Sequence, residues 1–306
     1  MGEGWVNLRD LEADLSNWTL GVIGGSGLYD IDGLHRQRWV KIDSPWGVPS
    51  DEVLMGEIDG VPLVFLPRHG RGHPTPPSQI NGRANIDVLK RAGCTDIVSF
   101  SAVGSRKEEL APGDFVVVDQ FIDRTFARAK SFFEKGFTAH VSMAHPVCPR
   151  LSAMALAAGQ KGAGKITGGG TYLAMEGPQF STLAESKLYR SWGCDLIGMT
   201  NMPEAKLARE AELPYASVCM VTDYDCWREE TGHVEVTDIL AVLHANAARA
   251  RALLLDLVLH MKGPREASPI DTGLDMAVIT DRAAWDPEQV SKLDAVCGRF
   301  FKARGV

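Results

Sequence analysis

The feature that most constrains the fold of this chain is an alternation of short apolar runs with amphipathic segments, from residue 20 to about residue 262. Several of the runs are apolar on both faces, as expected of strands that are covered on both sides. The expected strands are 20–23, 63–66, 97–102, 115–118, 171–175, 196–199 and 215–221. This order of elements predicts an α/β fold, with a central mixed or parallel β-sheet flanked by helices.

Helix signals lie between and after these strands: N-cap residues, a capping-box spacing at Thr182 and Glu185, an early Pro, and Gly at the helix ends. The expected helices are 78–93, 182–193, 201–212, 237–261 and 287–301. Residues 263–285 are expected to form a loop that passes over the surface. The sequence therefore predicts one domain, 1–306, with a core over 19–262 and a C-terminal extension over 263–306 that carries a terminal helix.

Composition excludes several classes of partner. A formal net charge of −7 over 306 residues argues against a nucleic-acid surface or an anionic membrane as the partner. No apolar run approaches the roughly 18 residues of a membrane helix, and the acidic N-terminal stretch lacks the apolar region of a signal peptide. Six cysteines without any Cys-x-x-Cys pair indicate a reduced, cytoplasmic protein without a structural zinc.

Two carboxylates, Asp223 and Asp225, directly follow the apolar run 215–221. Ligands of open α/β sheets bind beyond the carboxyl ends of the strands, so the pair is placed where a ligand would bind. Two acids suit a ligand edge that both accepts and donates hydrogen bonds, as adenine does with N7 and its N6 amino group. The alternatives are a solvated Asp-x-Asp turn and a weak divalent-cation site.

A glycine-rich turn, 24–27, follows the first strand and contains Ser26. Its backbone N–H groups could cradle a phosphate. It does not match the dinucleotide fingerprint, which needs Gly where Asp30 stands, and no Gly-Lys-Ser/Thr follows it. A tight turn that needs positive φ would explain the glycines equally well, but it leaves Ser26 without a role.

Arg68 and His69 begin the loop after strand 63–66. Arginine binds oxyanions through a planar fork of donors, so this loop could bind phosphate. A solvated basic loop is the alternative. A metal site of His69 and His73 would need a helix, which the glycines between them disfavour.

Other strand ends also carry polar or aromatic groups. Ser101 ends one strand, Met199 and Thr200 end another, and Phe180 follows a third. Each signal is weak alone, because a Ser or Thr at a helix start is usually a cap, and Met or Phe usually packs in a core. Their recurrence at strand ends favours a binding site there.

Together these motifs resemble those of a known family. The matching segments are IGGSGLYD (23–30), LPRHGRGH (66–73), SAVGS (101–105), DQFIDRT (119–125), MEGPQFSTLAES (175–186), GMTNMPEAKLARE (198–210) and TDYDCW (222–227). The chain resembles the trimeric purine nucleoside phosphorylase superfamily, and within it the S-methyl-5′-thioadenosine phosphorylases, over about residues 19–262. The resemblance implies phosphorolysis of methylthioadenosine to adenine and 5-methylthioribose 1-phosphate, in methionine and purine salvage.

The resemblance also implies roles for individual residues. Those that would bind phosphate are Ser26, Arg68, His69, Ser101, the amide of Ala102, and Thr200. Those that would bind the nucleoside are Met199 at the ribose, Phe180 on the purine, Asp223 and Asp225 at its edge, and His140 near the 5′ group of a neighbouring subunit's substrate. Ser181 and Val236 match positions associated with the choice of base and of 5′ substituent. The implied assembly is a homotrimer or a dimer of trimers. Inorganic phosphate is the implied co-substrate, with no cofactor and no metal.

The residue types suit this chemistry. Cleavage of an N-glycosidic bond builds positive charge on the ribose, which bound phosphate could offset while acting as the nucleophile. Asp223 could protonate N7 if burial raises its pKa, and Asp225 could accept from the N6 amino group. A 6-oxopurine would present an acceptor to that carboxylate, so an adenine nucleoside is favoured. The alternatives are a 6-oxopurine nucleoside or methylthioinosine phosphorylase and a non-catalytic nucleoside-binding protein.

Overall fold

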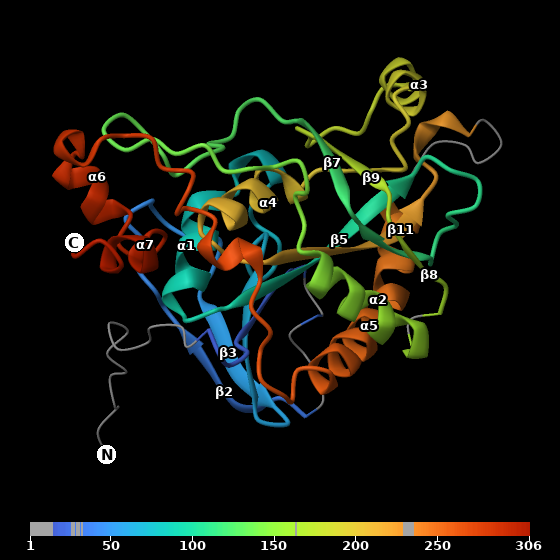
Figure 1. Ribbon diagram of the computed structural model, residues 1–306. Helices are drawn as coiled ribbons and strands as arrows, with labels where there is room; N and C mark the ends of the chain where they lie inside the picture. Colours follow the sequence, from blue (N-terminus) through green and yellow to red (C-terminus); the bar gives the residue numbers. More distant parts are fainter. Residues whose placement is uncertain (1–14, 26–27, 29–30, 32, 163, 229–235) are drawn as a thin grey trace.

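The computed structural model describes residues 15–25, 28, 31, 33–162, 164–228 and 236–306, and they form an α/β fold with a large mixed sheet (Figure 1). The strands are β1 (Leu20–Gly24), β2 (His35–Val40), β3 (Val53–Ile58), β4 (Val61–Pro67), β5 (Asp96–Ser105), β6 (Phe115–Val118), β7 (Gln120–Arg124), β8 (Ile166–Gly168), β9 (Thr171–Met175), β10 (Leu196–Gly198) and β11 (Tyr215–Asp223). The helices are α1 (Gly82–Arg91), α2 (Pro149–Gly162), α3 (Leu183–Ser191), α4 (Asn201–Glu210), α5 (Val236–Leu259), α6 (Pro287–Lys292) and α7 (Gly298–Lys302).

Among the described residues, 11 strands form one sheet in the order β2-β3-β4-β1-β5-β10-β9-β7, and β11, β6 and β8 branch from β5. The pairs β1–β4, β1–β5 and β5–β11 are parallel, whereas β3–β4 and β5–β10 are antiparallel. The predicted mixed sheet is therefore confirmed. Because β1, β4, β5 and β11 run in one direction, the residues after their carboxyl ends gather at one edge.

Strands β5 and β11 form the centre of the sheet. Their register pairs Tyr215 with Ile97 and continues to Val221 opposite Val103, after which it shifts so that Asp223 lies opposite Gly104. Eight consecutive residues of β11 are buried, as expected of a strand covered on both faces. The irregularity at the end of the strand falls where the first acid of the pair stands, and β-bulges re-aim side chains next to active sites.

Helices cover both faces of the sheet. α1 and α4 contribute to one hydrophobic cluster, and α2 and α5 contribute to a second (Figure 1). The described helices include no segment long and apolar enough to span a lipid bilayer.

All the expected strands are present, but β2, β3, β7 and β8 were not predicted. β2 is largely exposed and rich in charged residues, so it carries no apolar periodicity, and β8 has only 3 residues. The helix predicted to begin at Ser78 begins instead after Asn81, whose side chain accepts a hydrogen bond from the Ala84 amide at 3.1 Å. Pro77–Gln79 form a separate 3₁₀ turn. Helix α2 was also missed.

The capping box of Thr182 and Glu185 is confirmed at the start of α3. The helix predicted from Asn201 is present, but its N-cap is Thr200, and the backbone at Met202 is not helical. The long helix predicted from Thr237 corresponds to α5.

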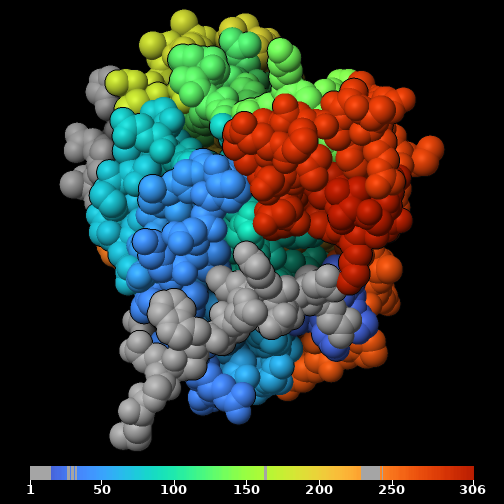
Figure 2. All heavy atoms as spheres, turned by 90° about the vertical axis from the view of Figure 1, so that its left-hand side faces the viewer, coloured from blue at the N-terminus to red at the C-terminus, as the bar shows by residue number. Residues whose placement is uncertain are grey.

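The C-terminal extension differs from the prediction in two respects. Residues 263–285 do not simply pass over the surface, because Ile270 and Leu274 are buried. The predicted helix 287–301 is two short helices, α6 and α7, and Phe300 and Phe301 of α7 are buried in the same cluster as α1 and α4. Figure 2 shows the C-terminal residues, in red, lying against residues of the first hundred positions, in blue and cyan. One domain over 1–306 stays a prediction, which this shared core supports.

Candidate active site

A cavity of about 290 Å³ opens at the carboxyl ends of the central strands. Each of β4, β5, β9, β10 and β11 contributes residues to it at or just after its carboxyl end. The predicted site residues that line it are Arg68, His69, Ala102, Phe180, Ser181, Met199, Thr200, Asp223 and Asp225. The structure therefore brings together most of the residues predicted for the site.

Arg68 enters this cavity from the end of β4, held by a backbone hydrogen bond from its N–H to the Gly24 carbonyl at 2.9 Å. The side chain is buried, and Nε donates to Glu204 Oε2 at 2.9 Å, while Nη2 donates to Glu204 Oε1 at 3.1 Å. Nη2 also donates to Ser99 Oγ at 2.5 Å, and Nη1 donates to the Phe100 carbonyl at 2.8 Å. These bonds fix the plane of the guanidinium and engage most of its five N–H groups.

His69 lies beside Arg68, and its Nδ1 is 2.9 Å from the Thr75 carbonyl oxygen. A carbonyl only accepts hydrogen bonds, so Nδ1 carries the proton. Burial, together with the nearby Arg68 charge, lowers the pKa of His69 to about 4. The ring is therefore neutral at pH 7, and its Nε2 can accept a hydrogen bond from a protonated phosphate oxygen. The ring stacks on His73 with 4.0 Å between centroids.

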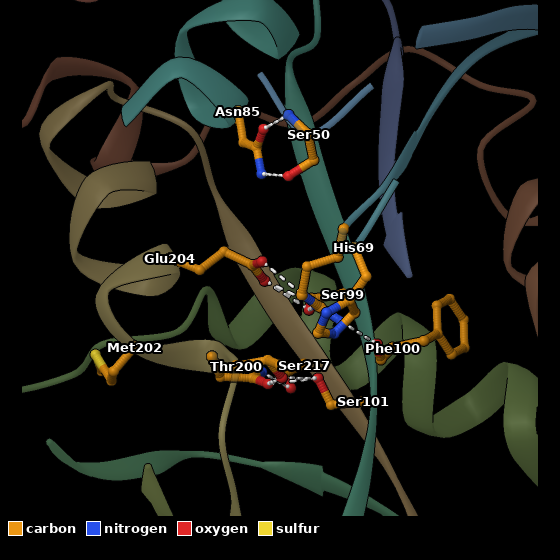
Figure 3. Close-up of polar contacts among 12 residues, drawn as sticks. Ser50, His69, Asn85, Ser99, Phe100, Ser101, Thr200, Met202, Glu204 and Ser217 are labelled. Carbon is orange, nitrogen blue, oxygen red and sulfur yellow. Dashed lines mark hydrogen bonds and ion pairs between the residues drawn. The ribbon is translucent and has the colours of Figure 1, made fainter. Parts of the chain in front are cut away.

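Hydroxyl groups continue the polar side of the cavity. Ser101 Oγ lies 3.1 Å from Thr200 Oγ1 and donates to Asn201 Oδ1 at 2.5 Å. Asn201 Nδ2 in turn donates to Tyr215 Oη at 2.9 Å and to Ser217 Oγ. Figure 3 shows Ser101, Thr200 and Ser217 grouped together, with Glu204 and Ser99 nearby. Ser101 does not itself line the cavity, but it holds Thr200, which does.

Asp223 stands at the end of β11. Its Oδ2 accepts from Thr222 Oγ1 at 2.7 Å, and its Oδ1 accepts from the Asp225 amide at 2.7 Å. Burial raises the pKa of Asp223, and the charge of Asp225 raises it further. A Cβ at Gly104 would lie 2.9 Å from Asp223 Oδ1, so this position of β5 requires a glycine for the carboxyl group to fit.

Asp225 is 6% exposed and occupies different surroundings. Its Oδ2 accepts from Arg106 Nη1 at 2.6 Å and from Ser186 Oγ at 2.6 Å. Asp225 therefore lies beside a fixed cation, whereas Asp223 is desolvated and has no cation at its carboxyl group among the described residues. Neighbouring carboxyl groups in contrasting surroundings are typical of sites where one donates a proton and the other stays ionised.

Phe180 lines the cavity and is 51% exposed, so part of its ring is available for contact with a ligand. Gly177, three residues earlier, has φ +68°, and a Cβ there would lie 2.5 Å from Met199 Sδ. The loop before α3 therefore packs directly on Met199. Arg128 fixes the backbone of this region, since Nη1 donates to the Met199 carbonyl at 2.6 Å and Nη2 to the Glu176 carbonyl at 2.6 Å.

Besides Ser101, one predicted site residue lies away from the described cavity, and the side chains of two others lie outside the part of the chain that the structure describes. Ser26 lies outside the described residues, and Val236 begins α5 with its side chain also outside them. His140 is exposed and lines a separate surface hollow with Lys130 and Glu210. Its predicted role toward a neighbouring subunit stays a prediction.

Sequence reasoning missed Glu204, Arg106 and Arg128. Glu204 lies in the first turn of α4, where an acid is a common helix signal, but it pairs with Arg68 across 136 positions of sequence. Arg106 directly follows an apolar strand, as Arg68 does. Its position after a strand was the feature of the sequence that could have identified it as a residue near the site. Among the described residues, no group of three or more His, Cys, Asp and Glu side chains could hold a metal ion.

Comparison with known proteins agrees with this geometry. The model of the phosphorylase superfamily matches residues 19–259. S-methyl-5′-thioadenosine phosphorylase of Cereibacter sphaeroides is 60% identical over 285 residues, which cover 92% of this chain and 98% of that protein. The protein of the same name from Rhodospirillum rubrum is 57% identical, over 92% of this chain and 97% of that protein.

Solved structures show the same relationship. A methylthioadenosine phosphorylase from an antarctic soil metagenomic library superposes with a TM-score of 0.87 at 43% identity, covering 92% of this chain and 99% of its own. Methylthioadenosine phosphorylase from Schistosoma mansoni in complex with adenine has a TM-score of 0.75 at 37% identity, covering 80% of this chain and 92% of its own. The chain therefore belongs to the phosphorylase superfamily, and within it to the family of the S-methyl-5′-thioadenosine phosphorylases.

Proposed function

We propose that this chain splits S-methyl-5′-thioadenosine with inorganic phosphate, releasing adenine and 5-methylthioribose 1-phosphate. The observation that carries the proposal is the difference between the two acids at the end of β11. Burial raises the pKa of Asp223, whereas Asp225 is paired with Arg106. A purine with an acceptor at N7 and a donor at N6 matches a protonated carboxyl beside an ionised one.

Asp223 is the proton donor to N7 in this proposal. The leaving purine departs as a neutral base when N7 gains a proton, and general acids of this kind contribute about 10²–10⁴-fold. Asp225 accepts from the N6 amino group, and Phe180 stacks on the purine face. Met199 lies against the ribose, and Ser181 and Val236 adjust the choice of base and of 5′ substituent.

Phosphate occupies the side of the cavity formed by Arg68, His69, the Ala102 amide and Thr200, with Ser101 holding Thr200 and Ser26 contributing from the glycine turn. Phosphate attacks C1′, so the protein supplies no side-chain nucleophile and the reaction needs no cofactor. Its charge also offsets the positive charge that develops on the ribose. A neutral His69 with its proton on Nδ1 fits a protonated phosphate oxygen, and the buried Arg68 supplies the positive charge.

The assembly is a homotrimer or a dimer of trimers in this proposal, with His140 reaching a neighbour's substrate. In support, His140 donates its backbone N–H to the Ala277 carbonyl at 2.8 Å, beside Met276, which is 95% exposed, and Ile279, which is 63% exposed. Exposed apolar side chains beside His140 suit a subunit contact. The six cysteines are unpaired thiols, which supports a reduced, cytoplasmic location.

The test is release of free base from methylthioadenosine and from methylthioinosine, each with and without phosphate. Phosphate-dependent release of adenine with little hypoxanthine is the expected result. Preference for the inosine form would overturn the roles of Asp223 and Asp225 and favour a 6-oxopurine phosphorylase. Release from neither, with retained nucleoside binding, would favour a non-catalytic binding protein.

A further inference from the structure

Arg106 is a buried cation that the reaction itself does not use. Its side chain is 0% exposed, and it does not line the cavity. It directly follows β5, and its backbone N–H donates to the Asp195 carbonyl at 2.9 Å. The guanidinium therefore reaches Asp225 without itself lining the cavity that Asp225 lines.

The contacts of Arg106 converge on one oxygen of Asp225. Nη1 donates to Asp225 Oδ2 at 2.6 Å, and Nη2 donates at 3.3 Å to Ser186 Oγ, which donates to the same Oδ2 at 2.6 Å. Arg106 and Ser186 therefore both bond to Oδ2, so that Oδ1 of Asp225 can accept from a donor in the cavity that Asp225 lines.

This arrangement does not satisfy all the hydrogen-bond donors of Arg106. Its Nε is buried and has no hydrogen-bond partner among the described residues. An unpaired buried donor costs stability, and a buried ion pair is weak evidence for stability. An apolar side chain would fill this place without that cost, so the position is better explained by what the charge does to Asp225.

A guanidinium stays protonated in proteins, so Arg106 is a permanent positive charge. A permanent positive charge at hydrogen-bond distance favours the ionised form of a carboxyl group, and an ionised carboxylate only accepts hydrogen bonds. Without that charge, Asp223 and Asp225 would be two adjacent acids able to exchange one proton. A protonated Asp225 could then donate to the oxygen of a 6-oxopurine.

We propose that Arg106 sets the selectivity for 6-aminopurine over 6-oxopurine nucleosides by holding Asp225 as an acceptor. Arg106 is a positioning residue, since it acts through Asp225 and does not touch the substrate. This inference rests on the proposed function, in which Asp225 reads the 6-position of the base.

Other charged or titratable groups lie near Arg106 and Asp225 and also contribute to the electrostatics around the Asp225 carboxylate. They are Asp223 on β11, Cys226 after it, Cys194 before β10, and Tyr189 and Arg190 on α3. Of these, Tyr189 lies 5.8 Å from the Arg106 guanidinium, and Arg190 stacks over Trp227 at 3.8 Å. Arg106 is the cation that bonds to the Asp225 carboxylate.

The test compares kcat/KM for methylthioadenosine and methylthioinosine, with saturating phosphate, between pH 6 and pH 9. Arg106→Met removes the charge and keeps the length of the side chain. Its preference for the adenine form should fall about 100-fold at pH 6, which is the size expected for exchanging one well-placed donor and acceptor. The loss of preference should be larger at pH 6 than at pH 9, because the neutral form of a carboxyl group, which could donate to a 6-oxopurine, is favoured at low pH. The wild-type preference should change little over this range.

Arg106→Lys keeps the charge and should restore most of the preference. Ser186→Ala removes the second hydrogen bond to Oδ2 without removing the charge, so it is the matched control and should keep the wild-type pH dependence. Asp225→Asn places a neutral side chain there directly, and adding Arg106→Met to it should leave the substrate ratio unchanged.

Equal losses for both substrates in Arg106→Met, with an unchanged ratio at every pH, would overturn the proposal and leave Arg106 a structural residue. If Arg106→Met does not fold, the lysine variant decides, since a lost preference with the charge retained would contradict the proposal. Failure of the proposed function is distinguishable, because the wild-type protein would then release no adenine or would prefer the inosine form.

Discussion

Arg68 and Glu204 form a buried, two-pronged ion pair at the cavity, with Nε–Oε2 and Nη2–Oε1 distances of 2.9 and 3.1 Å. Ser99 Oγ and Tyr215 Oη donate to the same Glu204 Oε1 at 2.7 and 2.8 Å. Figure 3 shows dashed lines that run from the Glu204 carboxylate toward Ser99. The carboxylate is therefore fully engaged, and its main effect is to fix the plane of the Arg68 guanidinium.

Glu204→Gln should raise the KM for phosphate about tenfold and change the KM for the nucleoside little, since a neutral amide cannot hold both prongs of the guanidinium. Steady-state kinetics with each substrate varied would measure this. Tyr215→Phe is the control, because it removes one hydrogen bond to Glu204 and leaves the ion pair intact. An unchanged phosphate KM in Glu204→Gln would show that Arg68 does not depend on Glu204 for binding phosphate.

Asp223→Asn should lower kcat/KM for methylthioadenosine by about 10²–10⁴-fold, because an amide can donate a hydrogen bond to N7 but cannot transfer the proton. The pH dependence has a definite sign. Burial raises the pKa of Asp223, and only its protonated form is the acid, so activity should fall as pH rises through that pKa. The asparagine variant should lose this limb of the pH–rate profile. Retention of the limb would assign it to another group.

Gly104→Ala should reduce kcat strongly while the protein stays folded. The added Cβ would lie 2.9 Å from Asp223 Oδ1 and 3.2 Å from Ile197 Cγ2, so the carboxyl group must move. A displacement of about 1 Å at a reacting group can cost about 10²-fold. Gly263→Ala is the matched control, since its Cβ would meet nothing within 4 Å. Equal kcat values for the two variants would mean that Asp223 tolerates the shift.

Glu210 should make the stability of the fold depend on pH. It is buried, accepts from Ser131 Oγ at 2.8 Å and from the Phe132 amide at 2.7 Å, and burial raises its pKa to about 7. A raised folded-state pKa means that the protonated form is favoured in the folded protein. The free energy of unfolding is therefore unaffected below the unfolded pKa near 4.5 and decreases as pH rises toward 7.

Glu210→Gln should remove this dependence and be more stable than the wild type at pH 8 by up to about 3 kcal/mol, with little difference at pH 4.5. Thermal melts of both proteins across this range would measure the difference. Glu288→Gln, at an exposed position, is the control. If the difference in stability between the wild type and Glu210→Gln were the same at every pH, Glu210 would be ionised in the folded protein over the whole pH range.

Local patterns predicted the framework of the fold. Apolar runs such as 215–221 identified the central strands. A strand that is buried on both faces is apolar at every position, whereas a surface strand alternates between apolar and polar residues. The capping box at Thr182 was also predicted correctly from the sequence, since its hydrogen bonds join residues only three positions apart. β2 and α2 were missed because their periodicity is weak, and the tail was misjudged because its apolar residues pack against α1 and α4, which are distant in the sequence.

The sequence by itself indicated where the site lies, because polar groups that directly follow parallel apolar strands gather at one edge of the sheet. It placed Arg68, Asp223 and Asp225 there without any knowledge of their partners, whereas Thr200 follows β10, which runs antiparallel to β5, so that only the fold brings it to the site. Only the tertiary structure decided what each of them does. Glu204 reaches Arg68 across 136 positions, and Arg106 reaches Asp225 across 119. The protonation of an acid depends on burial and on the nearest charge, and residues so distant in sequence supply both only once the chain has folded.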